Sequence, residues 1–301
     1  MTGDRVERLL RFRFIYRLAS FGFIGYPLIL CWRRGWLSHP RGEATASLRD
    51  GRLLHCQLDD ATQRTMYLGL FEPTETQLVR ELLSPGDTLL DIGAHIGWFS
   101  TVGSQRVGST GLVVAFEPFE RTLKMLRVNL QQNNCTNVRV VESALGSQAG
   151  TLTLASSGGD SGAVTALVWG TESRVEVPVV TLDEAEKDLT DVTLMKIDVE
   201  GWETNVLRGG GTTLSRIKSV LIEINGPAIL QSGSSPEEIF ELLRAAGFSY
   251  FFRVTEGGLR RFIPSQVDNV LAVRSDAPPT PSFWKQQGLR PRTYRRLEML
   301  N

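Results

Sequence analysis

The chain has 301 residues, and its 33 basic residues are balanced by 33 acidic ones. A neutral total and a hydrophobic content of 42% exclude an acidic disordered chain and a uniformly basic nucleic-acid-binding protein, so we expect no nucleic-acid partner. A chain of this length and composition can bury a sizeable core.

The charge is unevenly distributed along the chain. Residues 1–41 contain eight arginines and two acidic residues, a formal charge of +6, and residues 285–301 carry +4. The stretch between them, residues 42–284, carries −10. We therefore expect a basic N-terminal segment (1–41), a body (42–276), and a tail (277–301) that is first proline-rich and then basic.

The N-terminal segment contains 15 uncharged residues, 18–32, between Arg17 and Arg33. A membrane-spanning helix needs about 20 apolar residues, and Pro27 weakens a helix. Three interpretations stay open: a helix that packs on the body or forms a homodimer seam, a helix lying on an anionic membrane surface, and a spanning helix. No signal-peptide cleavage site follows, so we expect a cytoplasmic protein, with a peripheral position at the inner face of a membrane as the alternative.

The body shows alternating strands and helices. Apolar runs at 88–92, 112–117, 138–141, 193–199 and 219–224 predict strands, and helical spacing is visible at 96–107, 120–132 and 202–207. Continuous β-branched runs separated by helices are typical of a parallel sheet covered on both faces. The prediction is therefore an α/β fold.

Residues 147–190 interrupt this alternation. The runs 151–155 and 175–181 predict antiparallel strands, and the stretch 156–162 between them is either an acceptor lid or an ordinary surface loop. A capping box of Thr181 and Glu184 predicts a short helix. Ser235 followed by Pro236 predicts the start of another. The last two strands, 248–254 and 269–274, are close enough in sequence to favour an antiparallel pair.

The loop Asp91–Gly97, DIGAHIG, joins the first of these strands to a helix. Gly93 permits a sharp turn and close approach of a ligand to the backbone, although a simple tight turn would also account for it. The spacing lacks the G-x-G-x-x-G that seats a pyrophosphate, and the Asp91 carboxylate favours a ligand with positive character.

Glu117 ends the second strand, 20 residues after Gly97. An acid at this place can accept two hydrogen bonds from a ribose diol. Asp91 and Glu117 together indicate a nucleoside-containing, cationic ligand without a diphosphate. S-adenosylmethionine fits this description.

The chain resembles the FkbM-type methyltransferases, a branch of the class I S-adenosylmethionine-dependent enzymes. The motifs that carry the resemblance are DIGAHIG (91–97), FEP (116–118), KIDVEGW (196–202), VLRG (206–209) and NVLAV (269–273). KIDVEG followed by VLRG is the more specific pair, and the resemblance covers residues 66–274. It implies a Rossmann-like class I fold with seven mostly parallel strands, the last antiparallel, and helices on both faces, here with an N-terminal helical extension.

The resemblance also implies which residues bind the cofactor. Those assigned to its methionine part are Asp91, Gly93, Ala94 and Gly97, and Glu117 is assigned to the ribose. Those assigned to the adenine are Glu142, Ser143 and Ala144. Glu72, within Phe71–Glu72–Pro73, is expected to lie over the cofactor. His95, where many members have Asn, is expected either to orient the first helical turn or to act as a base, and we favour the first.

The motif 196–201 contains three charged residues, Lys196, Asp198 and Glu200, which period two places on one face of a strand. Charges on a central strand are costly unless paired, so a buried ion pair, for example Lys196 with Glu223, is the alternative to a catalytic role for Lys196. We expect Asp198 to orient the acceptor hydroxyl or to act as general base. Glu200 and Asn225 are further candidates for acceptor binding. Oxygen ligands are present, but nothing requires a metal.

The sequence therefore predicts an S-adenosylmethionine-dependent O-methyltransferase acting on a small molecule, a glycan or a lipid-linked glycan. The alternatives are a membrane-associated scaffold that keeps the fold without catalysis and a nucleotide-dependent oxidoreductase. The missing dinucleotide motif argues against the oxidoreductase.

Overall fold

The computed structural model describes residues 41–156, 173–255, 258–261 and 267–276. The described residues divide into two compact units, the first ending at Phe71 and the second beginning at Glu72. In the first unit, an antiparallel pair, β1 (Glu43–Ser47) and β2 (Leu53–Gln57), precedes helix α3 (Ala61–Tyr67).

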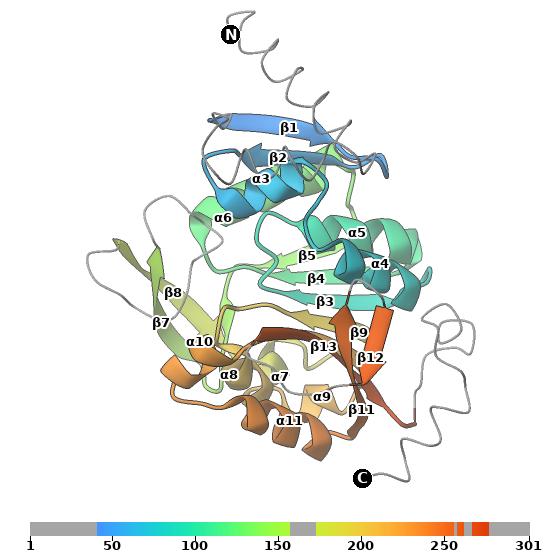
Figure 1. The fold of residues 1–301 in the computed structure, drawn as a ribbon, viewed down its shortest axis with the longest axis vertical. Helices are drawn as coiled ribbons and strands as arrows, with labels where there is room; N and C mark the ends of the chain where they lie inside the picture. The colour runs from blue at the N-terminus through green and yellow to red at the C-terminus, as the bar shows by residue number, and fades with distance from the viewer. Residues whose placement is uncertain (1–40, 157–172, 256–257, 262–266, 277–301) are drawn as a thin grey trace, which may run out of the picture. The chain divides into compact units, whose positions relative to one another are not determined.

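The second unit is built on an eight-stranded sheet in the order β12-β11-β13-β10-β9-β3-β4-β5 (Figure 1). Its strands are β3 (Thr88–Ile92), β4 (Leu112–Phe116), β5 (Val138–Val141), β9 (Val192–Ile197), β10 (Ile217–Asn225), β11 (Phe248–Thr255), β12 (Gly258–Arg261) and β13 (Val267–Arg274). Strands β5, β4, β3, β9 and β10 are parallel, and β13 runs antiparallel to β10 and β11. The predicted mostly parallel sheet with an antiparallel last strand is confirmed. The short edge strand β12, which pairs with β11, raises the expected seven strands to eight.

Helices cover both faces of this sheet (Figure 1). The helices of the second unit are α4 (Pro73–Leu82), α5 (Trp98–Val107), α6 (Glu120–Gln132), α7 (Leu182–Ala185), α8 (Glu203–Arg208), α9 (Gly211–Leu214), α10 (Gly226–Gln231) and α11 (Pro236–Ala245), with a 3₁₀ turn at Gly108–Thr110. Successive side chains of β3 point to opposite faces of the sheet, so the core has one part on each face. Leu89 packs closely on Gly103 of α5, whereas Leu90 shares a core cluster with Val206 of α8 and Leu243 of α11.

Local sequence signals account for the ends of several elements. The predicted capping box is present, because Thr181 accepts from the Glu184 amide and the Glu184 carboxylate accepts from the Thr181 amide. The Ser235 side chain caps α11 by accepting from the Glu238 amide, with Pro236 in the first turn. Such caps satisfy amides that a helix end would otherwise leave without partners.

The segment after β5, which interrupts the alternation of strands and helices, forms a separate sheet of three strands. These are β6 (Ala144–Leu145), β7 (Gly150–Ser156) and β8 (Ser173–Val180). Strands β7 and β8 are antiparallel, as predicted, and β6 adds to β8 in parallel. Residues 157–162 of the predicted lid, the apolar run 18–32 and the tail 277–301 lie outside the described residues. Among the helices that the structure describes, none has the length and apolar character to cross a membrane.

Candidate active site

The three acids singled out in the sequence lie at the carboxyl edge of adjacent parallel strands. Asp91 lies in β3, Glu117 directly follows β4, and Asp198 directly follows β9. Backbone hydrogen bonds continue beyond the strands: the Asp198 amide donates to Ile92 (3.0 Å) and the Glu117 amide to Val141 (3.1 Å). Ligands of open α/β sheets bind at this edge, where the strand order reverses, here around β3.

The β3–α5 loop, residues 93–97, has the backbone conformation that its glycines predict. Gly93 has φ 82°, and a Cβ atom there would lie 1.9 Å from the carbonyl oxygen of Asp198. Gly97 has φ 90°, and a Cβ there would lie 2.7 Å from Leu126 of α6. Both positions require glycine, because a side chain there would collide with packed atoms and its residue would have to adopt a left-handed backbone conformation.

Glu117 is held by backbone amides beside this loop. Its carboxylate accepts from the amides of His95 (2.8 Å) and Phe119 (2.9 Å), and the residue is only 7% exposed. Burial raises the pKa of Glu117 to about 7, because desolvation outweighs these hydrogen bonds. His95 thus contributes its backbone amide here, in a left-handed conformation with φ 51°.

Lys196 lies between the carboxylates of Asp91 and Asp198. It is the register partner of Asp91 on the neighbouring strand, its Nζ donates to Asp198 Oδ2 at 2.8 Å, and its ammonium lies 4.5 Å from the centre of the Phe99 ring. Burial alone would lower the pKa of Lys196, but the carboxylates of Asp198, Glu72 and Asp91 outweigh it and raise that pKa. The predicted buried ion pair is present. Its partner is Asp198 and not the suggested Glu223.

Asp91 is buried, 1% exposed, and accepts a hydrogen bond from the Ser100 hydroxyl of α5. Desolvation raises the pKa of Asp91, against the opposing effects of Lys196 and of Ser100. For Asp198 the balance is the reverse. Burial would raise its pKa, but the Lys196 ammonium and hydrogen bonds lower it. Asp198 is therefore the more readily ionised of the two.

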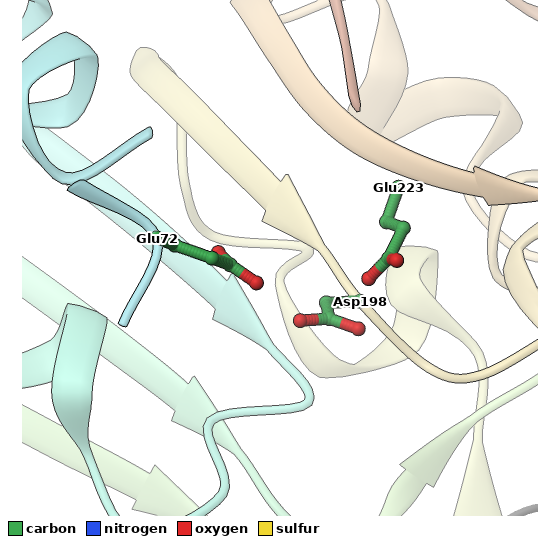
Figure 2. Close-up of side chains that lie close together, drawn as sticks. All are labelled: Glu72, Asp198 and Glu223. Atoms are coloured by element: carbon green, nitrogen blue, oxygen red, sulfur yellow. The ribbon is translucent and has the colours of Figure 1, made fainter. Parts of the chain in front are cut away.

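Figure 2 shows three carboxylates that point toward one another, those of Glu72, Asp198 and Glu223, which we call the carboxylate cluster. They come from the turn before α4, the end of β9 and the carboxyl-terminal part of β10, and their nearest oxygens lie within 4.8 Å of one another. Burial and the neighbouring Asp198 raise the pKa of Glu223 to about 9, so that Glu223 holds a proton in its hydrogen bond with Asp198 at neutral pH. Burial raises the pKa of Glu72 to about 7.

The spacing of this cluster would admit a cation. Within the described part of the chain, however, the Lys196 ammonium and the proton on Glu223 already offset much of its negative charge. Glu223 was the cluster member that sequence reasoning missed as a site residue. Its one signal was an acid inside the apolar run 220–224, and that signal supported an ion pair equally well.

Glu200 and Asn225 lie near the site in different settings. Strand β9 ends at Ile197 and Glu200 has φ 51°, so the period-two argument that grouped it with Lys196 does not extend to it. Burial and then Asp198 raise the pKa of Glu200 to about 7. Asn225 caps α10 through its side-chain oxygen, which accepts from the Ala228 amide at 3.3 Å.

The residues assigned to the adenine follow β5 at the same edge of the sheet. Glu142 is half exposed and forms an ion pair with Arg127 of α6. Ser143 is partly buried, and Ala144 begins β6. The adenine roles of these three residues stay predictions.

The family model described as the methyltransferase FkbM domain matches residues 91–250. The chain belongs to the FkbM methyltransferase family. The match begins at Asp91 and extends into β11, so it contains Glu117, Asp198 and Glu223.

Two curated relatives match with partial coverage. The 31-O-demethyl-FK506 methyltransferase FkbM of Streptomyces tacrolimicus is 30% identical over 201 residues, which cover 56% of this chain and 74% of the relative. The hexuronic acid methyltransferase AglP of Haloferax volcanii is 27% identical over 180 residues, covering 58% and 70%. Among solved structures, an S-adenosylmethionine-dependent O-methyltransferase from Thermotoga maritima matches with a TM-score of 0.43 at 15% identity, over 77% of each chain.

Proposed function

We propose that this methyltransferase transfers the methyl group of S-adenosylmethionine to a hydroxyl of a small molecule, a glycan or a lipid-linked glycan. The observation that carries the proposal is the meeting of Asp91, Glu117 and Asp198 at one edge of the sheet, around a loop whose Gly93 cannot carry a side chain. The family membership of the chain supports the reaction class.

The residues of the β3–α5 loop fit this cofactor. Gly93 cannot carry a side chain, because a Cβ there would collide with the Asp198 carbonyl oxygen, so the loop lies in backbone contact with the end of β9. Glu117, fixed by two amides, suits a ribose diol, and the carboxylate of Asp91 suits a cationic ligand. S-adenosylmethionine supplies an electrophilic methyl group carried on a positively charged sulfonium.

We assign the acceptor side to the carboxylate cluster. Asp198, kept ionised beside Lys196, accepts the hydrogen bond of the acceptor hydroxyl and orients its oxygen toward the methyl carbon. As the new oxygen–carbon bond forms and the methyl–sulfur bond breaks, the hydroxyl proton must leave. That proton moves along its hydrogen bond to Asp198, and Glu72, which has a pKa of about 7 and lies in the same carboxylate cluster, is matched to take it on near neutral pH. Lys196, which stays charged, holds Asp198 and is not a base. Glu200 and Asn225 are secondary candidates for acceptor contacts.

The acceptor class rests on the two curated relatives. One is named for a hexuronic acid and the other for 31-O-demethyl-FK506, a name that specifies an oxygen. Both names are compatible with a hydroxyl acceptor.

The test is transfer of a radiolabelled methyl group to extract of the source cells, separated into lipid, glycan and small-molecule fractions. We expect label in one fraction with the full chain and a large loss with Asp198→Asn. Label that is released by mild base like a methyl ester, or that is equal with Asp198→Asn, would contradict hydroxyl transfer at this cluster.

A further inference from the structure

The turn between β9 and α8, residues 198–202, is held by hydrogen bonds to one buried side chain, that of the residue directly after it. Glu203 Oε1 accepts hydrogen bonds from the backbone amides of Gly201 (3.0 Å) and Val199 (3.3 Å). Glu203 is 1% exposed and is the first residue of α8. One carboxylate oxygen thus closes the turn that directly follows Asp198.

This turn adopts a conformation that needs such support. Glu200 and Gly201 both have positive φ, 51° and 100°. A non-glycine residue in this region costs free energy, and such residues persist where the surroundings enforce them. Gly201 also lies against α10, because a Cβ there would be 2.7 Å from the Ala228 Cβ.

The same turn sets where Asp198 lies. The Asp198 amide donates to Ile92 of β3 at 3.0 Å, and its carbonyl oxygen occupies the space beside Gly93. On the other side, the next amide along the chain, that of Val199, is held by Glu203. Asp198 therefore lies between an anchor on β3 and an anchor on α8.

We propose that Glu203 is a positioning residue for methyl transfer, which acts through the Val199 and Gly201 amides to keep Asp198 in the carboxylate cluster and against the β3–α5 loop. The inference rests on the proposed function of that cluster. It needs an acceptor oxygen at the Oε1 position and does not need a negative charge, because both donors are neutral amides. Within the described residues, the second oxygen, Oε2, is buried without a hydrogen-bond partner, which also indicates that charge at Glu203 is not its role.

Three substitutions separate geometry from charge. Glu203→Gln keeps an acceptor oxygen at the same reach. Glu203→Asp keeps the charge but shortens the side chain by one methylene, and Glu203→Ala removes both. We expect the Gln variant to keep at least a third of the wild-type kcat, and the Asp and Ala variants to lose tenfold or more with the affinity for S-adenosylmethionine within threefold of wild type.

The matched control is Glu186→Ala. Glu186 is also a buried carboxyl, and one of its oxygens has no hydrogen-bond partner in the described part of the chain, but its other oxygen pairs with Arg139. Its loss should lower the thermal midpoint without lowering kcat at temperatures where the variant is folded. A purely structural role for Glu203 would give the same pattern as this control.

The measurements are calorimetry with S-adenosylmethionine, kcat on the extract fraction that the wild type methylates, and hydrogen exchange of the Val199 and Gly201 amides. We expect these amides to be protected in wild type and Glu203→Gln and to exchange at least tenfold faster in Glu203→Asp. Activity higher in Glu203→Asp than in Glu203→Gln, or equal kcat in all folded variants, would overturn the inference. A wild type that neither binds S-adenosylmethionine nor transfers a methyl group would instead reject the proposed function, and this inference with it.

Discussion

The carbonyl oxygen of Asp198 occupies the space that a side chain on Gly93 would need, since an ideal Cβ at Gly93 would lie 1.9 Å from it. This close contact joins the β3–α5 loop, which we assign to the cofactor, to the end of β9, which we assign to the acceptor. The two halves of the proposed reaction are thus fixed relative to one another by backbone contact.

Gly93→Ala should abolish or strongly weaken binding of S-adenosylmethionine. The new Cβ collides with backbone, which cannot move as a flexible side chain can, and the left-handed backbone adds about 1–2 kcal/mol. Gly86→Ala is the matched control, because Gly86 also has positive φ, 91°, but its nearest atom is 3.8 Å away. Thermal unfolding should show a larger stability loss in Gly93→Ala than in Gly86→Ala, and calorimetry should show a cofactor defect only in Gly93→Ala. Equal cofactor affinity in the two variants would contradict the contact.

Asp198→Asn should lower kcat by roughly 10²–10⁴-fold, the usual contribution of a positioned acid or base. Affinity for S-adenosylmethionine should stay within a few-fold, since Asp198 acts on the acceptor. Asp191→Asn is a suitable control, because Asp191 forms a surface ion pair with Lys218 on the same sheet. Turnover that survives in Asp198→Asn with intact cofactor affinity would show that Asp198 neither orients the hydroxyl nor receives its proton.

The free energy of unfolding of the cofactor-free protein should fall as pH rises from about 5 to 8. Burial raises the pKa of Glu117 from an ordinary 4.5 to about 7, so the folded state binds more protons than the unfolded state between these values. The stability present at low pH is therefore lost through this window, by an amount on the order of 3 kcal/mol from Glu117 alone. Denaturant titrations across pH should show the slope, and it should be shallower in Glu117→Gln. An identical slope in that variant would contradict the assignment.

Much of the sheet could be predicted because its signals are local. Strands β3 and β5 and helix α6 have the predicted bounds, since each is a continuous apolar run or a periodic stretch with a clear stop, such as Asn133 after α6. Strands β6 and β12 were not predicted, because two and four residues carry no periodicity and are strands only through their neighbours. The carboxylate cluster depends on contacts between residues 72, 198 and 223, which spacing along one chain cannot reveal.

Removal of divalent metal should leave activity unchanged. The Lys196 ammonium, which pairs with Asp198 at 2.8 Å, supplies positive charge to the carboxylate cluster. We expect equal kcat and equal thermal midpoints before and after dialysis against a chelator. A loss of activity on chelation that added Mg²⁺ reverses in the wild type, and that does not occur in Glu223→Gln, would instead indicate a metal site at the cluster.

Of the three interpretations of the basic segment 1–41, binding to an anionic membrane surface is the one that its formal charge of +6 and its uncharged run of 15 residues make testable. Flotation with anionic liposomes should recover the full chain and not a chain that lacks residues 1–41. Neutral liposomes are the control for charge. Equal flotation of the two chains on anionic liposomes would leave this segment without a membrane role.

The most direct test of the central claim is calorimetry of the full chain with S-adenosylmethionine. The account predicts saturable binding at one site per chain, lost or greatly weakened in Asp91→Ala, because Asp91 is the buried carboxylate at the base of the β3–α5 loop. No binding by the wild type at millimolar cofactor, or unchanged binding by folded Asp91→Ala, would contradict it.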